Sequence, residues 1–396
     1  MPDRRVLAAC SLYHLANDAA VTVTPALFPV LRTALGFGYA EVGLLTATGL
    51  AVTVAFQFVF GALADRADRR VLLPLGVAWL GVGTLLLSTA TSYGTLVLFV
   101  ALARIGASAY HPAGISWVAR EFRGAGVDRA MGVQSSFGDL GVLLGLLPAG
   151  LLAVVWGWRG TFLFWGALNL AAAGAGFALT AKTGSRGEQA DGPRSPVLPV
   201  LRGVAPWILP LAAGGAAFTI TVSYGPLLLT DRLRLSAAAA DVVVGLWIVT
   251  GSLAAFSFGR ISRRFGRFPA LLYAYLAVAV AGVMIATATA LWGVVLGLVA
   301  FNALLFITYP ALFSFVADAG DARSQGVAFG LLFGFQLVGG ALAAYASGLL
   351  AAATGRPEMP FHVLAFIALA TFVYLFVLRA VRDDRASPGL PSGPSP

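Results

Sequence analysis

Charged residues are scarce in this chain of 396 residues, and their scarcity limits what the protein can be. They make up 11% of the sequence, whereas hydrophobic residues make up 59%. A soluble globular protein carries about 25% charged residues, so a surface this poor in charge would be hard to keep in water. The composition therefore excludes an ordinary soluble fold and indicates that lipid is the solvent for most of the surface.

Cysteine and histidine are also nearly absent. The single cysteine, Cys10, excludes an internal disulfide bond and a thiolate metal cluster, and we expect it to be a small apolar filler. Three histidines without a close ligand pair argue against a metal site. The sequence also holds no nucleophile elbow and no Walker loop, so it predicts neither an enzyme nor an ATP-driven pump, and no cofactor.

The sequence is instead rich in long apolar runs. A bilayer core is about 30 Å thick and needs about 20 apolar residues per spanning helix. About twelve such runs occur, at residues 7–33, 40–63, 71–90, 94–118, 130–155, 159–181, 205–229, 237–258, 269–289, 291–317, 325–353 and 362–381. Continuous runs such as 291–301 and 363–378 lack the alternation of barrel strands. The sequence therefore predicts an all-α membrane protein with twelve transmembrane helices.

Basic residues are distributed unevenly between the two sets of loops. The net charge of +9 would suit a nucleic-acid-binding protein, but twenty of the 26 Lys and Arg residues fall in the two ends and in the loops that share their side. The opposite loops hold five, and Arg104 lies inside a span. Positive charge stays on the cytoplasmic side. We therefore expect a multi-pass protein of the cell (inner) membrane with both termini in the cytoplasm, anchored by Arg4 and Arg5 without a separate signal peptide, and no nucleic-acid partner.

The chain divides into two halves that resemble each other. Residues 182–204 form a polar, Gly- and Pro-rich linker with six predicted spans on each side. At an offset of 198 residues, the pairs in register are Gly61/Gly259, Arg66/Arg264, Arg69/Arg267 and Pro112/Pro310. This repeat predicts two pseudo-symmetric six-helix bundles. The predicted units are a first bundle at 1–181, the cytoplasmic linker at 182–204, a second bundle at 205–382 and a disordered cytoplasmic tail at 383–396.

The loop after the second span carries a recognisable motif. Residues 61–70, GALADRADRR, resemble the signature between helices 2 and 3 of the major facilitator superfamily, and the resemblance covers the whole chain. It implies a conformational latch, in which the acid meets a neighbouring helix N-terminus and basic partners. The residues that it implies for this latch are Gly61, Asp65, Arg66, Arg69 and Arg70. Asp68 stands where the family has glycine, which puts the tight turn in doubt. The second copy keeps Gly266 but has Arg263 in place of the acid, so the latch is expected mainly in the first half.

Ionisable residues lie inside the predicted spans of the first half. An ionisable group at mid-membrane is expensive and marks a functional site by default. His14 and Asp18 are four residues apart on the first span and share a helix face. Depth along the helices places Asp18 level with Arg104 on the fourth span, with His111 closer to the cytoplasm and Asp139 on the fifth span.

These residues predict a central cavity in which Asp18, Arg104 and Asp139 form a charge network. Protonation of an acid would release it from Arg104, so that substrate and proton compete for one site, as an antiporter requires. A structural ion pair that fixes helix packing is the alternative. His14, whose ordinary pKa is near 6.5, is a candidate proton carrier or a satisfied hydrogen-bonding residue. His111 precedes Pro112, so it lies at a helix bend as well as near the site.

A second resemblance narrows the family. His14, Asn17 and Asp18 on the first span, combined with Arg104 and the tripeptide Tyr110-His111-Pro112 on the fourth, resemble the fosmidomycin-resistance-type branch of drug exporters. This resemblance implies proton-driven export. The glycine-rich fifth span resembles an antiporter signature, with Leu147 where that signature has glycine before the proline.

The second half has few ionisable groups inside its spans. Candidate substrate-cavity residues of the whole chain are Tyr110, Gln134, Tyr224, Asn302, Tyr309 and Gln336. Further hydrogen-bonding or apolar candidates are Thr219, Thr221, Ser223, Phe218, Phe301, Phe306, Phe333 and Phe335. This asymmetry predicts that the first half couples protons while the second half shapes the pocket.

The sequence as a whole predicts a monomeric secondary transporter that exchanges a small organic compound or drug for protons across the bilayer. Proton-coupled uptake of a small organic anion is one alternative, in which Arg104 binds the substrate. A non-transporting membrane sensor or scaffold is another, although a scaffold needs neither paired halves, nor a latch, nor charges at mid-membrane. No role is predicted for the tail.

Overall fold

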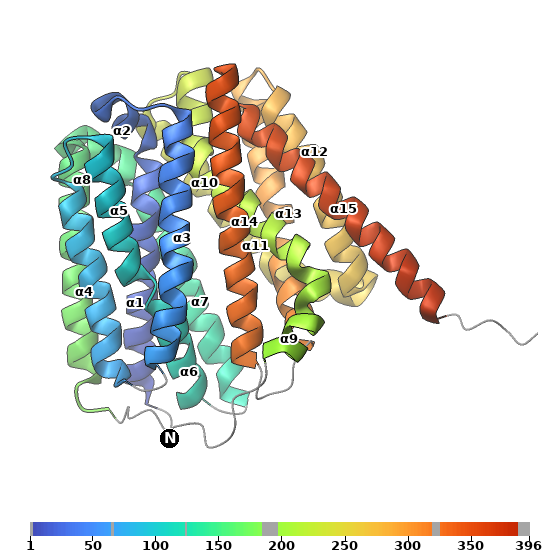
Figure 1. Cartoon of the computed structure of the whole chain (residues 1–396), viewed down its shortest axis with the longest axis horizontal. Helices are drawn as coiled ribbons and strands as arrows, with labels where there is room; N and C mark the ends of the chain where they lie inside the picture. Colours follow the sequence, from blue (N-terminus) through green and yellow to red (C-terminus); the bar gives the residue numbers. More distant parts are fainter. Residues whose placement is uncertain (1–2, 65–66, 123–124, 184–196, 319–324, 387–396) are drawn as a thin grey trace, which may run out of the picture.

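The structure is a computed structural model that describes residues 3–64, 67–122, 125–183, 197–318 and 325–386. Within these ranges the ordered elements are helices, most of them long and running between two opposite faces of the molecule (Figure 1). The helices form two six-helix bundles side by side, with the early helices in one and the late helices in the other (Figure 1). The predicted all-α fold with twelve transmembrane helices is confirmed.

The first bundle contains the helices from α1 to α8. Their bounds are α1 Arg4–Ala26, α2 Phe28–Leu35, α3 Tyr39–Ala64, α4 Arg69–Leu87, α5 Tyr93–Ala107, η1 His111–Ile115, α6 Ser116–Glu121, α7 Ala125–Leu146 and α8 Ala149–Thr180. The first span is α1 and the fourth combines α5, η1 and α6. The short helix α2 continues from α1 toward the loop before α3.

The second bundle contains the helices from α9 to α15. Their bounds are α9 Val197–Val204, η2 Ala205–Trp207, α10 Ile208–Leu227, η3 Leu228–Arg232, α11 Ala237–Phe265, α12 Arg267–Thr287, α13 Leu291–Asp318, α14 Gln325–Thr354 and α15 Met359–Ala386. The elements from α9 to η3 run on without a break and contain the seventh span.

Eleven helical segments among the described residues are long and apolar enough to cross a membrane. The twelfth membrane helix of the fold is α7. Its mean hydropathy is lowered because it contains the polar residues Gln134, Ser135, Ser136 and Asp139. This difference from a uniform count of twelve has a physical reason. A helix that faces the centre of a bundle can carry polar groups that a lipid-facing helix cannot.

A local widening of the fourth span positions two aromatic side chains. Pro112 has no N–H to donate, and its ring would clash with the carbonyl of the fourth residue before it. The chain passes this point as a π-helical turn, η1, with Pro112 in its first positions. Such single π turns often occur at functional sites. The turn brings Tyr110 and His111 against the same partner on α1, the ring of His14.

The two ends of the bundles differ in charge. We call the basic face the end that carries Arg4, Arg69, Arg120, Arg263 and Arg379, and the far face the end that carries Arg32, Arg159, Arg232 and Arg356. The chain begins at the basic face (Figure 1). The helices alternate between the two faces, as a bundle of antiparallel neighbours joined by short loops must.

The far face is closed by polar contacts between the bundles. Arg32 donates from Nη1 to Oδ2 of Asp231 at 2.6 Å, and the hydroxyl of Tyr39 donates to the same oxygen at 2.6 Å. The guanidinium of Arg32 also lies 4.1 Å above the ring of Tyr39. Asp231 belongs to η3 of the second bundle, whereas Arg32 and Tyr39 belong to the first. These contacts therefore join the halves, and we call them the far-face latch.

Glycine contacts bring the backbones of the two bundles together below this latch. A Cβ at Gly43 of α3 would lie 2.6 Å from the carbonyl oxygen of Ala344 on α14, and 3.2 Å from Cα of Gly348. A Cβ at Gly150 of α8 would lie 2.6 Å from the backbone nitrogen of Ala238 on α11. Small residues let membrane helices approach closely. The far face is therefore sealed at backbone distance.

Candidate functional site

A cavity of about 640 Å³ lies between the two bundles. Side chains of α1, α3, α5 and α7 line it from the first bundle, and side chains of α10, α11, α13 and α14 line it from the second. Toward the basic face the lining reaches Gln57 and Gly132, about two helical turns from the basic ends of α3 and α7. Toward the far face it stops at residues such as Phe28, Thr46 and Ser223. The cavity thus lies on the basic-face side of the seal.

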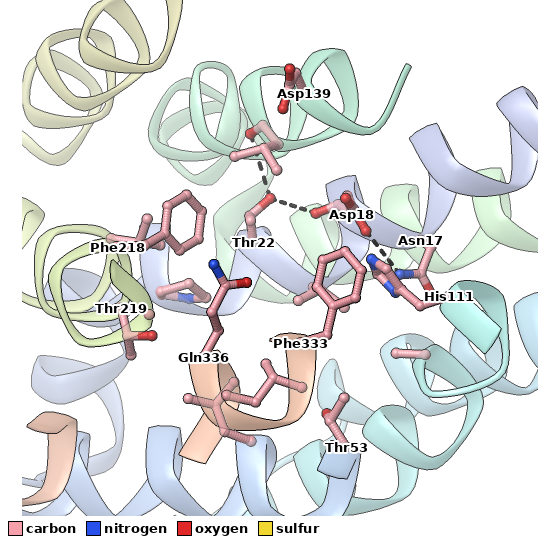
Figure 2. Close-up of a pocket in the computed structure, with 18 of the residues that line it drawn as sticks. Asn17, Asp18, Thr22, Thr53, His111, Asp139, Phe218, Thr219, Phe333 and Gln336 are labelled. Carbon is pink, nitrogen blue, oxygen red and sulfur yellow. Dashed lines mark hydrogen bonds between the residues drawn. The ribbon is translucent and has the colours of Figure 1, made fainter. Parts of the chain in front are cut away.

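Asp18 lies on the cavity wall with a histidine beside it. Nε2 of His14 is 3.3 Å from Oδ2 of Asp18, and Nδ2 of Asn17 donates to Oδ1 of Asp18 at 2.9 Å. The side chain of Asp18 is 19% exposed and that of His14 is 9% exposed. Both partners come from α1 itself: His14 is four residues away and shares the helix face of Asp18, and Asn17 is the preceding residue. Figure 2 shows Asp18 and Asn17 together, with His111 beside them.

The other ring nitrogen of His14 reveals where its hydrogen lies. Nδ1 of His14 is 2.8 Å from the backbone carbonyl oxygen of Gln134 on α7. A carbonyl oxygen only accepts hydrogen bonds, so Nδ1 carries the hydrogen. In a neutral ring, Nε2 would then turn a lone pair toward a carboxylate oxygen, and two acceptors would face each other. A second proton between Nε2 and Asp18 removes this conflict, so the pair is arranged to hold one proton.

Tyr110 and Gln134 support His14 from behind. The ring of Tyr110 stacks on the ring of His14 with centroids 4.4 Å apart, and its hydroxyl donates to Oε1 of Gln134 at 2.8 Å. Gln134 donates onward from Nε2 to Ser135 at 2.9 Å. The His14 ring also occupies the space where a side chain of Gly138 would lie. Tyr110 and Gln134 were expected to line the cavity, but they are buried behind its wall and fix the imidazole in place.

Arg104 lines the cavity and has no ion pair to an acid in the described part of the chain. Its Nη2 approaches the carbonyl oxygen of Val21 at 3.5 Å, a long contact, and its side chain lies against Gly49 of α3. Among the described residues it forms no ion pair with Asp18 or Asp139. The expected three-residue network is therefore not formed in this structure. The reason is local, because neighbours on α1 already take both oxygens of Asp18.

Asp139 lines the same cavity from α7. It is exposed to the cavity, and its carboxyl group has no hydrogen bond or ion pair in the part of the chain that the structure describes. Figure 2 places it on the helix opposite Gln336 and Phe333. Asp139 thus adds a second, separate carboxylate to the first-bundle side of the cavity.

His111 stands closer to Asp18 than its position in the sequence suggested. Its ring meets the ring of His14 edge-on at 5.4 Å between centroids and lies 5.7 Å from the ring of Phe333 on α14. The ligand atoms of His14, Asp18 and His111 all fall within 4.8 Å of one another. The premise that the histidines have no close ligand pair is therefore wrong, since the fold brings them together. The expectation of no metal stays a prediction.

The second bundle gives the cavity an aromatic wall. Phe218 and Thr219 come from α10, and the remaining side chains of this wall are Phe306, Tyr309, Phe313, Phe333 and Gln336. The hydroxyl of Tyr309 donates to the carbonyl oxygen of Gly214 at 3.3 Å. Nε2 of Gln336 is buried without a hydrogen-bond partner among the described residues. Figure 2 shows the Gln336 side chain extended into the space between Phe218 and Phe333.

Two expected cavity residues of the second bundle lie elsewhere. Tyr224 is fully buried, and its hydroxyl donates to the carbonyl oxygen of Ala344 at 2.8 Å beside the glycine seal. Asn302 is fully buried between α13 and α11, where Nδ2 donates to the carbonyl oxygen of Trp247. A buried polar group needs a hydrogen-bond partner. In both cases the partner is the backbone of a packed helix, so the prediction that these residues line the cavity is wrong.

The expected latch at the basic face is described only in part, because Asp65 and Arg66 lie outside the described residues. Gly61 faces Pro112, and Arg69 is buried. Asp68 caps α4 by accepting from the backbone of Arg70, with φ of −70°, so this position does not require glycine. Arg70 pairs with Asp68 at 2.6 Å and donates to the carbonyl oxygen of Thr183 at 2.7 Å.

Several polar cavity residues escaped the sequence reasoning. Thr22, Thr53 and Gln57 line the cavity, and the hydroxyl of Thr53 donates to the carbonyl oxygen of Gly49 within its own helix. Their signal was present in the sequence. Thr22 follows Asp18 by four residues and Gln57 follows Thr53 by four, so each pair shares a helix face. Such hydroxyl and amide groups are weaker signals than charges, because a threonine in a helix can satisfy itself on its own backbone.

Comparisons of sequence place this geometry among known proteins. A family profile described as Major Facilitator Superfamily matches residues 10–344. The chain is 31% identical over 152 residues to the fosmidomycin resistance protein of Escherichia coli, a match that covers 38% of this chain and 37% of that protein. It is 28% identical over 284 residues to a chloramphenicol resistance protein of Pseudomonas aeruginosa, covering 69% of this chain and 66% of that protein. The matches thus span between about a third and two thirds of these relatives. They agree with the resemblance to drug-exporter-type members.

Comparisons of structure give the same fold. A bacterial homologue of the human lysosomal transporter Spinster, in an inward-facing and occupied conformation, superposes with a TM-score of 0.77 at 19% identity over 99% of this chain and 100% of that chain. A D-xylose–proton symporter superposes with a TM-score of 0.78 at 13% identity over 95% of this chain and 98% of that chain. At these identities the structures show the fold alone. Together with the profile match, they establish that the chain is a membrane transporter, not an enzyme, and that it belongs to the Major Facilitator Superfamily.

Proposed function

We propose that the protein is a proton-coupled antiporter that exports a small organic compound or drug by alternating access. The observation that carries this proposal is the His14–Asp18 pair, which is arranged to hold one proton on the wall of a central cavity. The protein acts as a monomer in the cell (inner) membrane, with the basic face and both termini in the cytoplasm. The boundaries of its two bundles and linker remain those predicted from the sequence.

The coupling step follows from the partners of Asp18. While a proton lies between His14 and Asp18, the pair is satisfied within α1 and Arg104 has no carboxylate to bind. Loss of that proton leaves a carboxylate facing an imidazole lone pair. The available cation on the same cavity wall is then Arg104. Proton release therefore changes which helix Asp18 is attracted to, from a contact within α1 to one between α1 and α5.

Substrate binding is assigned to the opposite wall. The cavity volume falls within the range of about 300–1,000 Å³ that suits drug-sized ligands. Phe218, Phe306 and Phe333 offer apolar contact, and Nε2 of Gln336 offers an unused hydrogen-bond donor. These features favour a compound with an apolar or aromatic body and at least one hydrogen-bond acceptor. The names of the relatives, resistance to fosmidomycin and to chloramphenicol, support export of antibiotics or similar compounds.

The test is proton movement in proteoliposomes that carry the purified protein. A panel of amphipathic drugs and small organic anions is added, and internal pH is followed. Proton movement opposite to the substrate is expected, and Asp18→Asn should reduce it by about 5–150-fold, the usual range of a coupling between two ligands. Asp318→Asn is a matched control, because Asp318 pairs with Arg267 away from the cavity. Undiminished antiport by Asp18→Asn would show that Asp18 is not the coupling site.

A second candidate function rests on Arg104. This guanidinium lines the cavity and has no carboxylate partner among the residues that the structure describes, so it can bind an anionic substrate. Proton-coupled uptake of a small organic anion would then move proton and substrate in the same direction. The same assay separates the two functions by the sign of the pH change. A sensor or scaffold would give no pH change with any compound.

A further inference from the structure

Asp241 is a buried acid that the coupling step above does not use. It lies in the first turns of α11 at the far-face end, and its side chain is fully buried. Neither carboxyl oxygen accepts a hydrogen bond of normal geometry in the described part of the chain. A buried carboxyl group without partners is unusual, because an ionised carboxylate loses its hydration and receives nothing in return.

The burial of Asp241 depends on contact between the two bundles. Its helix α11 belongs to the second bundle and packs against α7 and α8 of the first. The closest approach is at Gly150, where a Cβ would lie 2.6 Å from the nitrogen of Ala238, three residues before Asp241. The backbone N–H of Gly150, at the start of α8, also approaches the carboxyl group. If the bundles separate at the far face, this cover is removed and water reaches Asp241.

The charged and titratable groups on the helices around α11 do not compensate Asp241. On η3, Asp231 is held by Arg32 and Tyr39, and Arg232 donates to the carbonyl oxygen of Ala286. On α8, Arg159 donates to the carbonyl oxygen of Ala90. The remaining described groups are Arg234 in the turn before α11, Arg129 and Asp139 on α7, Tyr224 on α10, Arg267, Tyr273 and Tyr275 on α12, Tyr309 and Asp318 on α13, and Arg260, Arg263 and Arg264 at the basic end of α11 itself. None of them has a hydrogen bond or ion pair with Asp241 among the described residues.

We propose that Asp241 is a second proton-binding site, which takes up a proton when the far face closes and releases it when the far face opens. The start of α8 would favour an anion, but a helix N-terminus offsets only a small part of the cost of removing a carboxylate from water. Closure and protonation are therefore linked. This proton-binding site is separate from the His14–Asp18 site, and its linkage to closure does not depend on the identity of the substrate.

The sign of the linkage is set by which state holds the proton. The closed far face binds the proton and the open one releases it, so rising pH favours opening. One linked proton changes this equilibrium by at most about tenfold per pH unit. In an exporter that takes up protons from the far side, protonation of Asp241 would then drive closure of the far face after the substrate has left.

The experiment measures how often the far face opens. Ser223 lines the cavity just inside the seal and is buried, so Ser223→Cys in a Cys10→Ala background provides a single reporter thiol. A membrane-impermeant maleimide is added from the far side of oriented vesicles, without substrate, between pH 6 and 8. Because the thiolate is the reacting species, each rate is divided by that of a small model thiol at the same pH, and the labelling rate is this ratio. We expect the labelling rate to rise by about three- to tenfold per pH unit. Asp241→Asn in the same background should label slowly and change less than twofold over the whole range.

The matched control is Asp231→Asn, which removes the other acid of this region. It should label faster at every pH, because it weakens the far-face latch, and it should keep the parent's dependence on pH. Two results overturn the proposal. One is faster labelling of Asp241→Asn than of the parent, which would make Asp241 an ionised cap on α8. The other is labelling of the parent that does not depend on pH, and this result does not require the Asp241→Asn variant to fold. Both results are independent of the transport assay that tests Asp18.

Discussion

The two bundles place different side chains at equivalent positions. Residue 302 follows residue 104 by the repeat offset of 198, and residue 247 follows residue 49 by the same offset. In the first bundle, Arg104 lies against Gly49 and lines the cavity. In the second, Asn302 bonds to the backbone of Trp247 and is fully buried. One helix crossing thus carries a charge at the cavity in one bundle and an uncharged packing contact in the other.

The difference shows that two halves with the same fold can present different side chains to one cavity. Glycine at position 49 leaves room for a guanidinium beside α3. At the equivalent crossing, Asn302 packs against Gly251 of α11 and binds the helix backbone. The first bundle therefore keeps its titratable groups at the cavity, and the second presents mainly aromatic surface. The sequence-based expectation of this asymmetry agrees with the placement of these residues, although their roles in transport remain a proposal.

The largest effect is expected when the side chains of the two equivalent positions, 104 and 302, are exchanged. Asn302→Arg would bury a charge between α13 and α11 without a partner, and we expect it to destabilise the protein by about 3–5 kcal/mol. Arg104→Asn faces the cavity, so it should fold normally and lose transport by about 5–150-fold. Thermal unfolding in detergent and proteoliposome transport measure the two effects. Equal stability of both variants would contradict the division between the bundles.

The next effect concerns the room that Gly49 provides. A Cβ at this position would lie 3.3 Å from Nε of Arg104 and 3.3 Å from Cγ1 of Val100. Gly49→Leu should therefore displace Arg104, cost about 1–3 kcal/mol of stability through overpacking and lower transport severalfold. Gly174→Leu is the control, because a Cβ at Gly174 would meet no atom within 4 Å. Retention of full transport by Gly49→Leu would show that the position of Arg104 is not critical.

A smaller effect is expected at the far-face latch, where the two bundles contribute unequal partners. Tyr39→Phe removes one of the two donors that the first bundle contributes to Asp231 and leaves Arg32 in place. A hydrogen bond to a charged group contributes about 1.5–3 kcal/mol, and Arg32 retains part of that. Far-side labelling of the Ser223→Cys reporter should rise severalfold, without a change in its dependence on pH. An unchanged labelling rate would mean that the glycine contacts alone keep the far face closed.

The smallest effect concerns a charge pair of the second bundle that lies outside the spans. Glu358, between α14 and α15, accepts from Nε of Arg356 at 2.8 Å. Burial raises the pKa of Glu358, but the Arg356 hydrogen bond and nearby arginines outweigh it and hold the pKa below its usual value. The pair therefore stabilises the fold above the unfolded pKa, and this contribution is lost as pH falls through the folded pKa.

Because the Arg356 side chain is 60% exposed and solvent screens its charge, Glu358→Gln should cost only about 0–1 kcal/mol near neutral pH. The difference between the variant and the parent should shrink as pH falls below about 4. Thermal unfolding at pH 7 and at pH 4 checks the sign. A difference that grows on acidification would mean that the carboxyl group is not stabilised as an anion.

Much of the fold followed from the sequence because it depends on length and composition. Runs of about 20 apolar residues, the distribution of arginine and the offset of 198 residues are properties of the chain alone. The His14–Asp18 pair followed from spacing, since four residues return a helix to the same face. These predictions needed no knowledge of how one helix is turned relative to the next.

The contacts that were predicted wrongly depend on how each helix is rotated about its own axis. Depth along the membrane placed Arg104 level with Asp18, but depth does not reveal that both oxygens of Asp18 are already taken on α1. Tyr224 and Asn302 are polar in the sequence, yet both turn toward neighbouring backbones. His111 reached His14 because the π-helical turn η1 widens the fourth span at Pro112, which no periodicity of the sequence encodes.

The glycine seal at the far face has an electrical consequence. Gly43, Gly150 and Gly348 hold the bundles at backbone distance, which leaves no space for a file of water molecules. The cavity on the other side reaches to within about two helical turns of the basic face. Part of the transmembrane voltage therefore falls across this insulating layer, and moving one elementary charge through the whole voltage is worth about 2.3 kcal/mol per 100 mV. In the proposed antiport, a proton that travels from the far side to Asp18 gains the part of that energy that falls across the seal.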